Sequence, residues 1–218
     1  RWSTRAYAGT ILQSETKLYS QWDEELIIRD FFNDREGGFF LDVGAAHYRE
    51  SSTTYYLEKH LGWSGIAVDA LEEYAAGYAA ERPNTKFFNR IVTDHSGTIE
   101  PFYRVIHPRG FSSALKSYVD RVRPGGYEVV SVPTATLNDL LDQHGVASID
   151  LVSMDIEDGE PAALAGFDIQ RFKPKLVCIE AHDTVAGQIL TYFTEHGYER
   201  IEAYDEYDDV NWYFRPGE

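Results

Sequence analysis

The sequence predicts an α/β fold with a mostly parallel sheet of about seven strands, helices on both faces and an antiparallel hairpin at the carboxyl end. Short apolar runs alternate along the chain with amphipathic stretches, an order typical of strand–helix–strand units. Right-handed crossovers between parallel strands place helices on both faces. With 218 residues, 43% hydrophobic and 26% charged, the chain is long enough for one compact domain and short for two.

The amino-terminal half is expected to hold three strands of this sheet. Ser20, with Asp23 three residues later, is typical of a helix start, and apolar residues then recur at helical spacing. Apolar runs of strand length follow, separated by amphipathic stretches. The expected elements are a helix over 21–34, a strand over 39–43, a helix over 52–61, a strand over 65–69, a helix over 72–81, a strand over 86–92 and an antiparallel edge strand over 98–105.

The carboxyl-terminal half continues this alternation after a long connection over residues 106–127, which contains HPRG and RPGG. A connection of this length is usually functional or disordered. Thr136 is typical of an N-cap, and apolar runs resume beyond it. The expected elements are a helix over 137–144, a strand over 149–155, a helix over 161–167, a strand over 175–180, a helix that ends at His196, and antiparallel strands over 198–204 and 211–215.

In such a sheet the ligand crevice lies outside the carboxyl ends of the strands, so the residues that follow the strands are the candidates. The first strand ends at Asp42 and Gly44, where a tight turn lets a ligand without phosphates approach the backbone. A dinucleotide fingerprint requires glycines at the positions of Ala46 and Arg49, so NAD and FAD fit poorly. Alternatively, Gly44 serves the turn alone.

The next two strands also end in polar residues. A carboxylate at Asp69 can accept hydrogen bonds from both ribose hydroxyls of a nucleoside, or it can cap the helix that follows. After the third strand, a side-chain acceptor at Thr93 or Asp94 can face an adenine amine. The alternative is an Asx turn at Asp94.

Acidic residues cluster after the fourth and fifth parallel strands. Asp155 and Glu157 follow one strand, and Glu180 ends the other. Carboxylate oxygens that converge in one crevice suit Mg²⁺ or a similar hard cation. Glu160, by contrast, has the alternative role of starting a helix, because acidic residues favour helix amino termini.

Two of the seven histidines, His47 and His182, follow parallel strands into the predicted crevice. Each is a candidate general base, because imidazole titrates near neutral pH. The other histidines lie at predicted helix ends, in a turn or in the long connection.

The charge balance of 20 basic and 36 acidic residues, a net of −16, makes general binding to nucleic acid unfavourable. Between Arg104 and Arg123 the balance reverses, with five basic residues and one acid, which makes this island a candidate receiver for an anionic group. The single cysteine, Cys178, fits a reducing compartment, and we expect a cytoplasmic protein. No apolar run approaches the ~18 residues of a membrane span.

Five segments together resemble the FkbM-type methyltransferases, which belong to the Rossmann-like enzymes that use S-adenosylmethionine. The similarity runs from about Tyr19 to Glu180. Its segments are YSQWDEELI (19–27), FFLDVGAAH (39–47), GWSGIAVDA (62–70), VPTATLNDLL (132–141) and SMDIEDGEPAALAGF (153–167). The resemblance implies a class I methyltransferase domain over 37–218, preceded by a helical segment over 1–36 that packs on the core.

The resemblance also implies which residues bind S-adenosylmethionine. It places the methionine end of this cofactor at the first strand, the ribose at the second and the adenine near the third, with the first helix closing over the site. The implied cofactor residues are Gln21, Glu24, Asp42, Gly44, Ala45, Asp69, Ala70, Thr93, Asp94 and Asp155. Some relatives hold a divalent metal at the position of Asp155, Glu180 and His182.

The sequence therefore predicts a methyltransferase that acts on a hydroxyl of a small polar or glycosylated molecule, such as a sugar, a uronic acid or a polyketide. Either His182 or His47 takes the hydroxyl proton, or a metal on Asp155 and Glu180 lowers the pKa of the hydroxyl. The substrate loop is expected over about 106–127. The candidate substrate residues are Arg109, Phe111, Ser112, Ser113 and Glu157. The alternatives are a catalytically silent binding protein and an NAD-dependent nucleotide-sugar reductase, and a homo-oligomer is compatible with the aromatic content.

Overall fold

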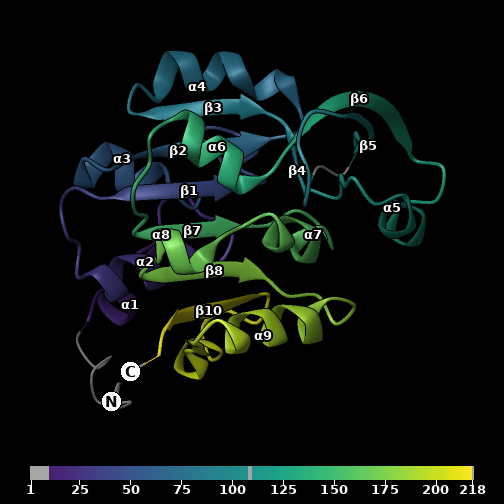
Figure 1. Cartoon of the computed structure of the whole chain (residues 1–218). Coiled ribbons are helices and arrows are strands. Elements are labelled where there is room, and N and C mark those ends of the chain that lie inside the picture. Colours follow the sequence, from purple (N-terminus) through teal and green to yellow (C-terminus); the bar gives the residue numbers. More distant parts are fainter. Residues whose placement is uncertain (1–9, 108–109, 218) are drawn as a thin grey trace.

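The computed structural model describes residues 10–107 and 110–217. Within these residues the main sheet consists of β1 (Phe39–Val43), β2 (Ser64–Asp69), β3 (Thr85–Asn89), β7 (Leu151–Met154), β8 (Leu176–Glu180), β9 (Tyr198–Arg200) and β10 (Asn211–Pro216). Their order is β3-β2-β1-β7-β8-β10-β9 (Figure 1). In this order β3, β2, β1, β7 and β8 are parallel to one another, whereas β10 is antiparallel to β8 and β9. The predicted mostly parallel sheet with a carboxyl-terminal antiparallel pair is confirmed.

Helices cover both faces of this sheet, as predicted (Figure 1). The helices of the described residues are α1 (Ile11–Ser14), α2 (Glu24–Phe32), α3 (Tyr55–Leu61), α4 (Ala75–Glu81), α5 (Lys116–Val122), α6 (Leu137–Gln143), α7 (Glu160–Ala165), α8 (Ile169–Phe172), α9 (Ala186–Glu195) and the short 3₁₀ turns η1 (Glu72–Tyr74) and η2 (Glu202–Tyr204). Apolar residues of α6 to α9 form one core with the sheet, and those of α1 to α3 form the other.

The alternation of side chains along β1 positions the first site residue. Leu41 and Val43 are buried in the core beneath α6 to α9, whereas Phe40 is buried in the core beneath α2 and α3. Because successive side chains of a strand point to opposite faces, Asp42 points to the same side as Phe40. There it meets Thr54, whose hydroxyl donates a 2.6 Å hydrogen bond to the Asp42 carboxylate.

The middle of the chain departs from the sequence prediction. The expected strand over 86–92 is divided at Arg90 into β3 and a two-residue strand, β4 (Ile91–Val92), which leaves the main sheet. The expected edge strand becomes β5 (Ile99–Val105), which pairs with β6 (Tyr127–Ala135) in a separate sheet of order β4-β6-β5. The connection over 106–127 contains α5, which lies beside this small sheet (Figure 1).

Helix starts and ends differ in smaller ways. The first predicted helix begins at Glu24 rather than 21, with Asp23 as its N-cap residue, while the buried Ser20 hydroxyl accepts a hydrogen bond from the Glu25 N–H in the first turn. The predicted cap at Thr136 is confirmed, because its hydroxyl accepts from the Asp139 N–H at 3.0 Å. The strand expected over 198–204 ends at Arg200, and η2 follows it.

A buried ion pair supports the loop between β1 and α3. The Arg82 guanidinium donates to the Glu58 carboxylate, and both side chains are at most 1% exposed. The same guanidinium donates to the Tyr48 carbonyl at 2.9 Å and to the Thr54 hydroxyl at 3.2 Å. Arg82, which directly follows α4, thus connects the end of that helix to α3 and to the loop that follows β1.

We expect Arg82→Met to lower the free energy of unfolding by about 3–5 kcal/mol, because removal of one partner leaves the Glu58 carboxylate buried and unpaired. Denaturation in urea measures this loss. The control is Arg171→Met, since Arg171 pairs with Asp142 at the surface, where its side chain is 49% exposed. There the expected loss is below about 1 kcal/mol. Equal losses in the two variants would contradict a structural role for the buried pair.

None of the helices in residues 10–107 and 110–217 is both long enough and apolar enough to cross a membrane.

Candidate active site

A cavity of about 440 Å³ lies at the carboxyl ends of the parallel strands. Many of the residues that the sequence singled out line it, although they are scattered along the chain. They are Gln21, Glu24, Asp42, Gly44, Ala45, Asp69, Ala70, Phe111, Ser112, Asp155, Glu157, Glu180 and His182. A cavity of this size is ordinary for a small-molecule site. The topology therefore gathers the strand-end residues in one place.

Gly44 is required by the loop opposite it. Its φ of +81° is a left-handed conformation, and a Cβ built on it would lie 1.8 Å from the Asp155 carbonyl oxygen. The Asp155 N–H in turn donates to the Val43 carbonyl at 2.9 Å. The missing side chain thus allows the loops after β1 and β7 to meet beside the cavity, a contact that the sequence did not reveal.

Asp69 connects the ends of β1 and β2. One carboxylate oxygen accepts from the Ala46 N–H at 2.9 Å, and the other accepts from the Leu71 N–H at 2.7 Å. A carboxylate oxygen can accept two hydrogen bonds, so each still has capacity toward the cavity. Asp69 therefore holds the backbone that leads into η1, although the N-cap residue of η1 is Leu71, and it keeps the capacity for a ribose.

Within residues 10–107 and 110–217, a group with the ligand chemistry of a metal site is formed by Glu157, Glu180 and His182, whose ligand atoms lie within 4.8 Å of one another. The His182 Nε2 is 3.2 Å from Glu180 Oε1. The other oxygen of Glu180, Oε2, is buried without a hydrogen-bond partner among the described residues. Asp155, expected as a ligand, lines the same cavity but does not belong to this group.

The backbone that carries Glu157 has an unusual conformation. Glu157 and Asp158 both have left-handed backbone conformations, with φ of 58° and 71°. Two such residues in succession turn the loop sharply, so that Glu157 reaches the cavity. Non-glycine residues rarely adopt this conformation, and the spacing of DIEDGE did not predict it.

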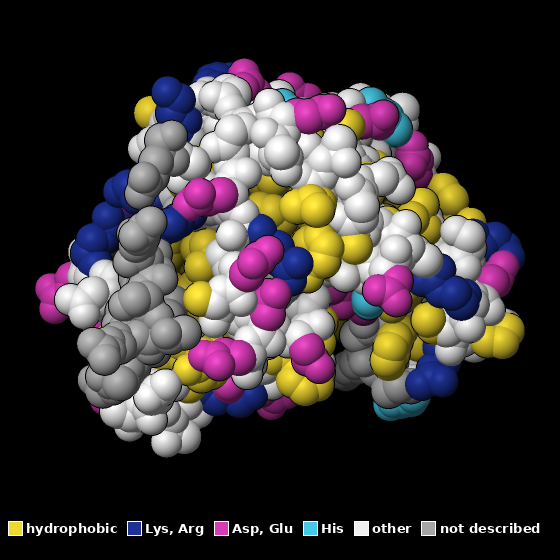
Figure 2. Space-filling model, turned by 90° about the horizontal axis from the view of Figure 1, so that it is seen from below, with side chains coloured by type: hydrophobic (Ala, Val, Ile, Leu, Met, Phe, Trp, Pro, Cys, Tyr) yellow, Lys and Arg dark blue, Asp and Glu magenta, His cyan; other side chains and the backbone are white. Residues whose placement is uncertain are grey.

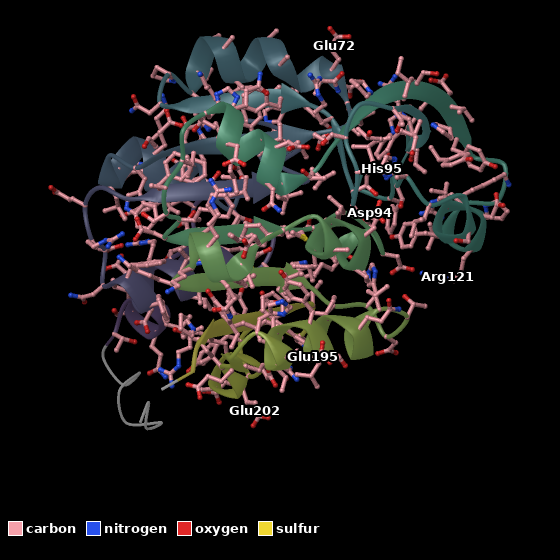
Figure 3. All side chains as sticks on the ribbon, in the orientation of Figure 1. Glu72, Asp94, His95, Arg121, Glu195 and Glu202 are labelled. Carbon is pink, nitrogen blue, oxygen red and sulfur yellow. The ribbon has the colours of Figure 1, made fainter. Side chains whose placement is uncertain are left out.

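Three further residues at this site were not predicted as functional. The Tyr118 hydroxyl on α5 donates to the Glu157 carboxylate, and its ring stacks on His182 with centroids 5.8 Å apart. Asp158 accepts from His182 Nδ1 at 3.0 Å and from Arg121 at 2.7 Å. Figure 3 shows Arg121 on α5. The sequence could have suggested Asp158, which lies within the DIEDGE segment. Tyr118 and Arg121 lie within the substrate loop expected over 106–127, although neither was singled out there.

Other predicted residues lie away from the cavity. His47 does not line it, and its Nδ1 accepts the N–H groups of Arg49 and Glu50 within its own loop. Thr93 and Asp94 are also absent from the lining.

Asp94 is exposed beside the small sheet, where it contacts His95 at 2.7 Å (Figure 3). The buried hydroxyl of Ser113 donates to the Glu157 carbonyl at 2.8 Å, so Ser113 supports the site from outside its lining. Arg109 lies outside the described residues.

The basic island on the small sheet and α5 is largely paired with acidic residues. Arg104 contacts Glu73 and Glu128, and Lys116 contacts Asp120. Figure 2 shows basic and acidic side chains next to one another on this part of the molecule. The island is therefore less available to an anionic group than its sequence suggests.

The buried carboxyls predict how stability depends on pH. Burial raises the pKa of Glu24 and of Glu160 to about 7, and that of Asp42 to about 6. The hydrogen bond to Glu180 raises the pKa of His182 to about 9. Each folded-state pKa is above its unfolded value, so the folded protein gains stability while these groups hold protons and loses it as pH rises through the folded values.

We expect the melting temperature of the ligand-free protein to fall between about pH 6 and pH 8.5, by at least about 4 °C if about 2 kcal/mol is lost. Scanning calorimetry at a series of pH values measures the slope. Glu160→Gln should flatten it, because the variant has no proton to lose at this buried position. Glu195→Gln, on the exposed side of α9, is the control (Figure 3). A stability that is flat or rises over this range would refute the assignment.

Residues 42–200 of the sequence match the methyltransferase FkbM domain. The chain belongs to the FkbM methyltransferase family. This FkbM protein is therefore an S-adenosylmethionine-dependent methyltransferase, as the sequence resemblance implied. No curated protein matches its sequence.

The fold of this FkbM methyltransferase is similar to several solved methyltransferases. A TehB-like S-adenosylmethionine-dependent methyltransferase from Corynebacterium glutamicum superposes with a TM-score of 0.50 and 14% identity, covering 91% of this chain and 89% of the other. A Geobacter sulfurreducens methyltransferase in complex with S-adenosylhomocysteine has a TM-score of 0.44 and 10% identity, with coverage of 95% and 78%. The first likeness shows the class I Rossmann-like methyltransferase fold.

Proposed function

We propose that this FkbM methyltransferase transfers a methyl group to a hydroxyl of a small polar molecule, with a sugar as the favoured acceptor. The observation that carries the proposal is the group of Glu157, Glu180 and His182, which converges at the edge of the cavity expected to hold the cofactor. Carboxylates and an imidazole are suited to bind hydroxyl oxygens or a hard cation.

The cavity fits S-adenosylmethionine. Apolar side chains of Leu71, Ile91 and Val92 line the part of it beyond β2, which suits an adenine ring. Asp69, with remaining acceptor capacity, is placed between that part and the loop after β1. The buried carboxyl groups of Glu24 and Asp42 line the other part, which suits the positively charged methionine end.

A divalent cation also fits the chain. Glu157, Glu180 and His182 offer two carboxylates and an imidazole, and the buried Glu180 Oε2 has no partner among the described residues. When bound, such a cation would polarise the acceptor hydroxyl and lower its pKa. In the absence of the cation, the proton on His182 supplies the positive charge between Glu180 and Asp158.

The chain's own residues would orient the acceptor. Methyl transfer needs the hydroxyl oxygen behind the methyl group, and such positioning can contribute about 7–11 kcal/mol. Phe111, Ser112 and Tyr118 line the side of the cavity under α5. Glu157 and Glu180 face them from the strand ends and can accept hydrogen bonds from neighbouring hydroxyls of one acceptor.

The charges of the site favour a neutral acceptor over an anionic one. The acidic residues of the lining, among them Asp155, Glu157 and Glu180, outnumber its basic residues, Arg90 and His182, so the lining as a whole disfavours an anion. The basic side chains of Arg104, Lys116 and Arg121 contact acids instead. A neutral glycosyl group is therefore a better candidate than the uronic acid or phosphate that the basic island suggested.

Incubation with methyl-labelled S-adenosylmethionine and matched neutral and anionic glycosides, followed by mass spectrometry, tests the proposal. We expect label on a hydroxyl of a neutral glycoside, with turnover abolished by EDTA and restored by Mg²⁺ or Mn²⁺. Label on nitrogen would refute O-methylation, and full turnover in EDTA would refute the cation. Binding of S-adenosylmethionine without transfer to any acceptor would favour a catalytically silent binding protein. Binding of NADH would favour an NAD-dependent reductase.

A further inference from the structure

His182 is held from three sides. Its Nδ1 lies 3.0 Å from Asp158 Oδ1, and its Nε2 lies 3.2 Å from Glu180 Oε1. The ring of Tyr118 stacks on its face at 20° between the ring planes. The imidazole is thus fixed in one orientation, with Nε2 toward the group of Glu157 and Glu180 and Nδ1 away from it.

Both carboxylate oxygens of Asp158 accept hydrogen bonds from side chains of the protein. Its side chain is 7% exposed, and Oδ1 also accepts from the Thr184 hydroxyl at 2.8 Å. Its Oδ2 accepts from the Arg121 guanidinium at 2.7 Å. The hydrogen bonds from Arg121, Thr184 and His182 hold this carboxylate against the ring of His182.

We propose that Asp158 is a positioning residue, which holds the Nδ1–H of His182 so that Nε2 faces the space between Glu157 and Glu180, where loss of the Nε2 proton frees a lone pair. The inference rests on the proposed function, in which that space receives a divalent cation or the acceptor hydroxyl. A carboxylate behind an imidazole fixes the position of its proton and its orientation, and raises its basicity as a ligand. Loss of such a carboxylate typically weakens metal affinity about 10–100-fold.

Arg121 extends this arrangement to α5. Tyr118 and Arg121 are three residues apart on α5, so they lie on the same side of the helix. One contacts Glu157, and the other contacts Asp158. Arg121 is 48% exposed, and we expect it to support Asp158 less than the buried partners do.

Calorimetry with Mn²⁺ and the complete chain tests the proposal. We expect Asp158→Ala to weaken Mn²⁺ binding about 10–100-fold, with S-adenosylmethionine affinity unchanged. Asp158→Asn should recover most of the loss, because an amide oxygen can still accept from Nδ1–H. Arg121→Met should weaken binding less than about 10-fold. Asp183→Asn is the control, since Asp183 is the exposed neighbour of His182 and lies outside the cluster.

A second measurement does not depend on the metal. NMR titration of the metal-free protein should give a lower His182 pKa in Asp158→Ala than in the parent, and no change in Asp183→Asn. An unchanged His182 pKa, or Mn²⁺ binding as tight as in the parent, would overturn the positioning role and leave the proposed function standing. If the parent binds no Mn²⁺, the cation part of the proposed function fails, while a lowered His182 pKa still supports the role of Asp158. If Asp158→Ala does not fold, Asp158→Asn and Arg121→Met provide the comparison.

Discussion

Gly44→Ala should lower the free energy of unfolding by about 2–5 kcal/mol and weaken S-adenosylmethionine binding at least tenfold. A side chain at φ +81° costs about 1–2 kcal/mol, and the Cβ would overlap the Asp155 carbonyl oxygen, from which it would be 1.8 Å away. Relief of the overlap must separate the loops after β1 and β7, which carry the residues proposed to bind the cofactor and the acceptor. Urea denaturation and calorimetry measure the two effects.

Gly62→Ala is the matched control for this prediction. Gly62 has a similar φ of +67°, but no described atom lies within 4 Å of a Cβ built there. Gly62→Ala should lower the free energy of unfolding only by the cost of a left-handed conformation, about 1 kcal/mol, and should bind the cofactor as the parent does. If the two variants behaved alike, the contact between the loops would not be what requires Gly44.

Glu180→Gln should reduce methyl transfer at least 100-fold and abolish Mn²⁺ binding. The substitution keeps the size of the side chain but removes the charge that the Glu157 and His182 group needs to hold a cation. Cofactor affinity should change by less than about threefold, because the cofactor contacts expected at Asp69 and Gly44 are untouched. Single-turnover transfer and calorimetry separate the two steps.

The melting temperature gives this prediction a second readout. Glu180 Oε2 is buried without a described partner beside other carboxylates, so a neutral amide should leave stability unchanged or raise it. Asp183→Asn, at the neighbouring exposed position, should leave transfer, Mn²⁺ binding and stability as they are. An active Glu180→Gln enzyme would exclude Glu180 from the reaction.

The sequence could predict that the residues after the strands lie close together, because the carboxyl ends of parallel strands lie at the same edge of a sheet. Apolar runs fixed β1, β2, β7 and β8, and the residues after them meet in one cavity. The small sheet was not predictable in this way. β6 contains Pro133 and has an exposed Val129, and β4 contributes only two residues, so neither has the continuous apolar pattern of a buried strand.

The details of the site depend on contacts that spacing does not encode. Glu157 joins the group of Glu180 and His182 from a turn in which two successive non-glycine residues adopt positive φ. The acidic partners of the basic island, such as Glu73 and Asp158, come from other elements, so its pairing could not be predicted from its own composition. Asp94 pairs with His95 at the surface, away from the cavity where adenine is expected.

The contacts of α5 have a consequence for acceptor choice. Tyr118 contacts Glu157 and Arg121 contacts Asp158, the next residue of the same turn. From this turn Glu157 lines the cavity, and Asp158 contacts Nδ1 of His182. An acceptor too bulky for the part of the cavity beneath α5 would displace this helix. The carboxylates of Glu157 and Asp158, which contact it, would be displaced as well. We therefore expect an acceptor that is too large for the cavity to disturb the positions of the residues that would act on it. Steric fit and reactivity toward an acceptor would then depend on the same contacts.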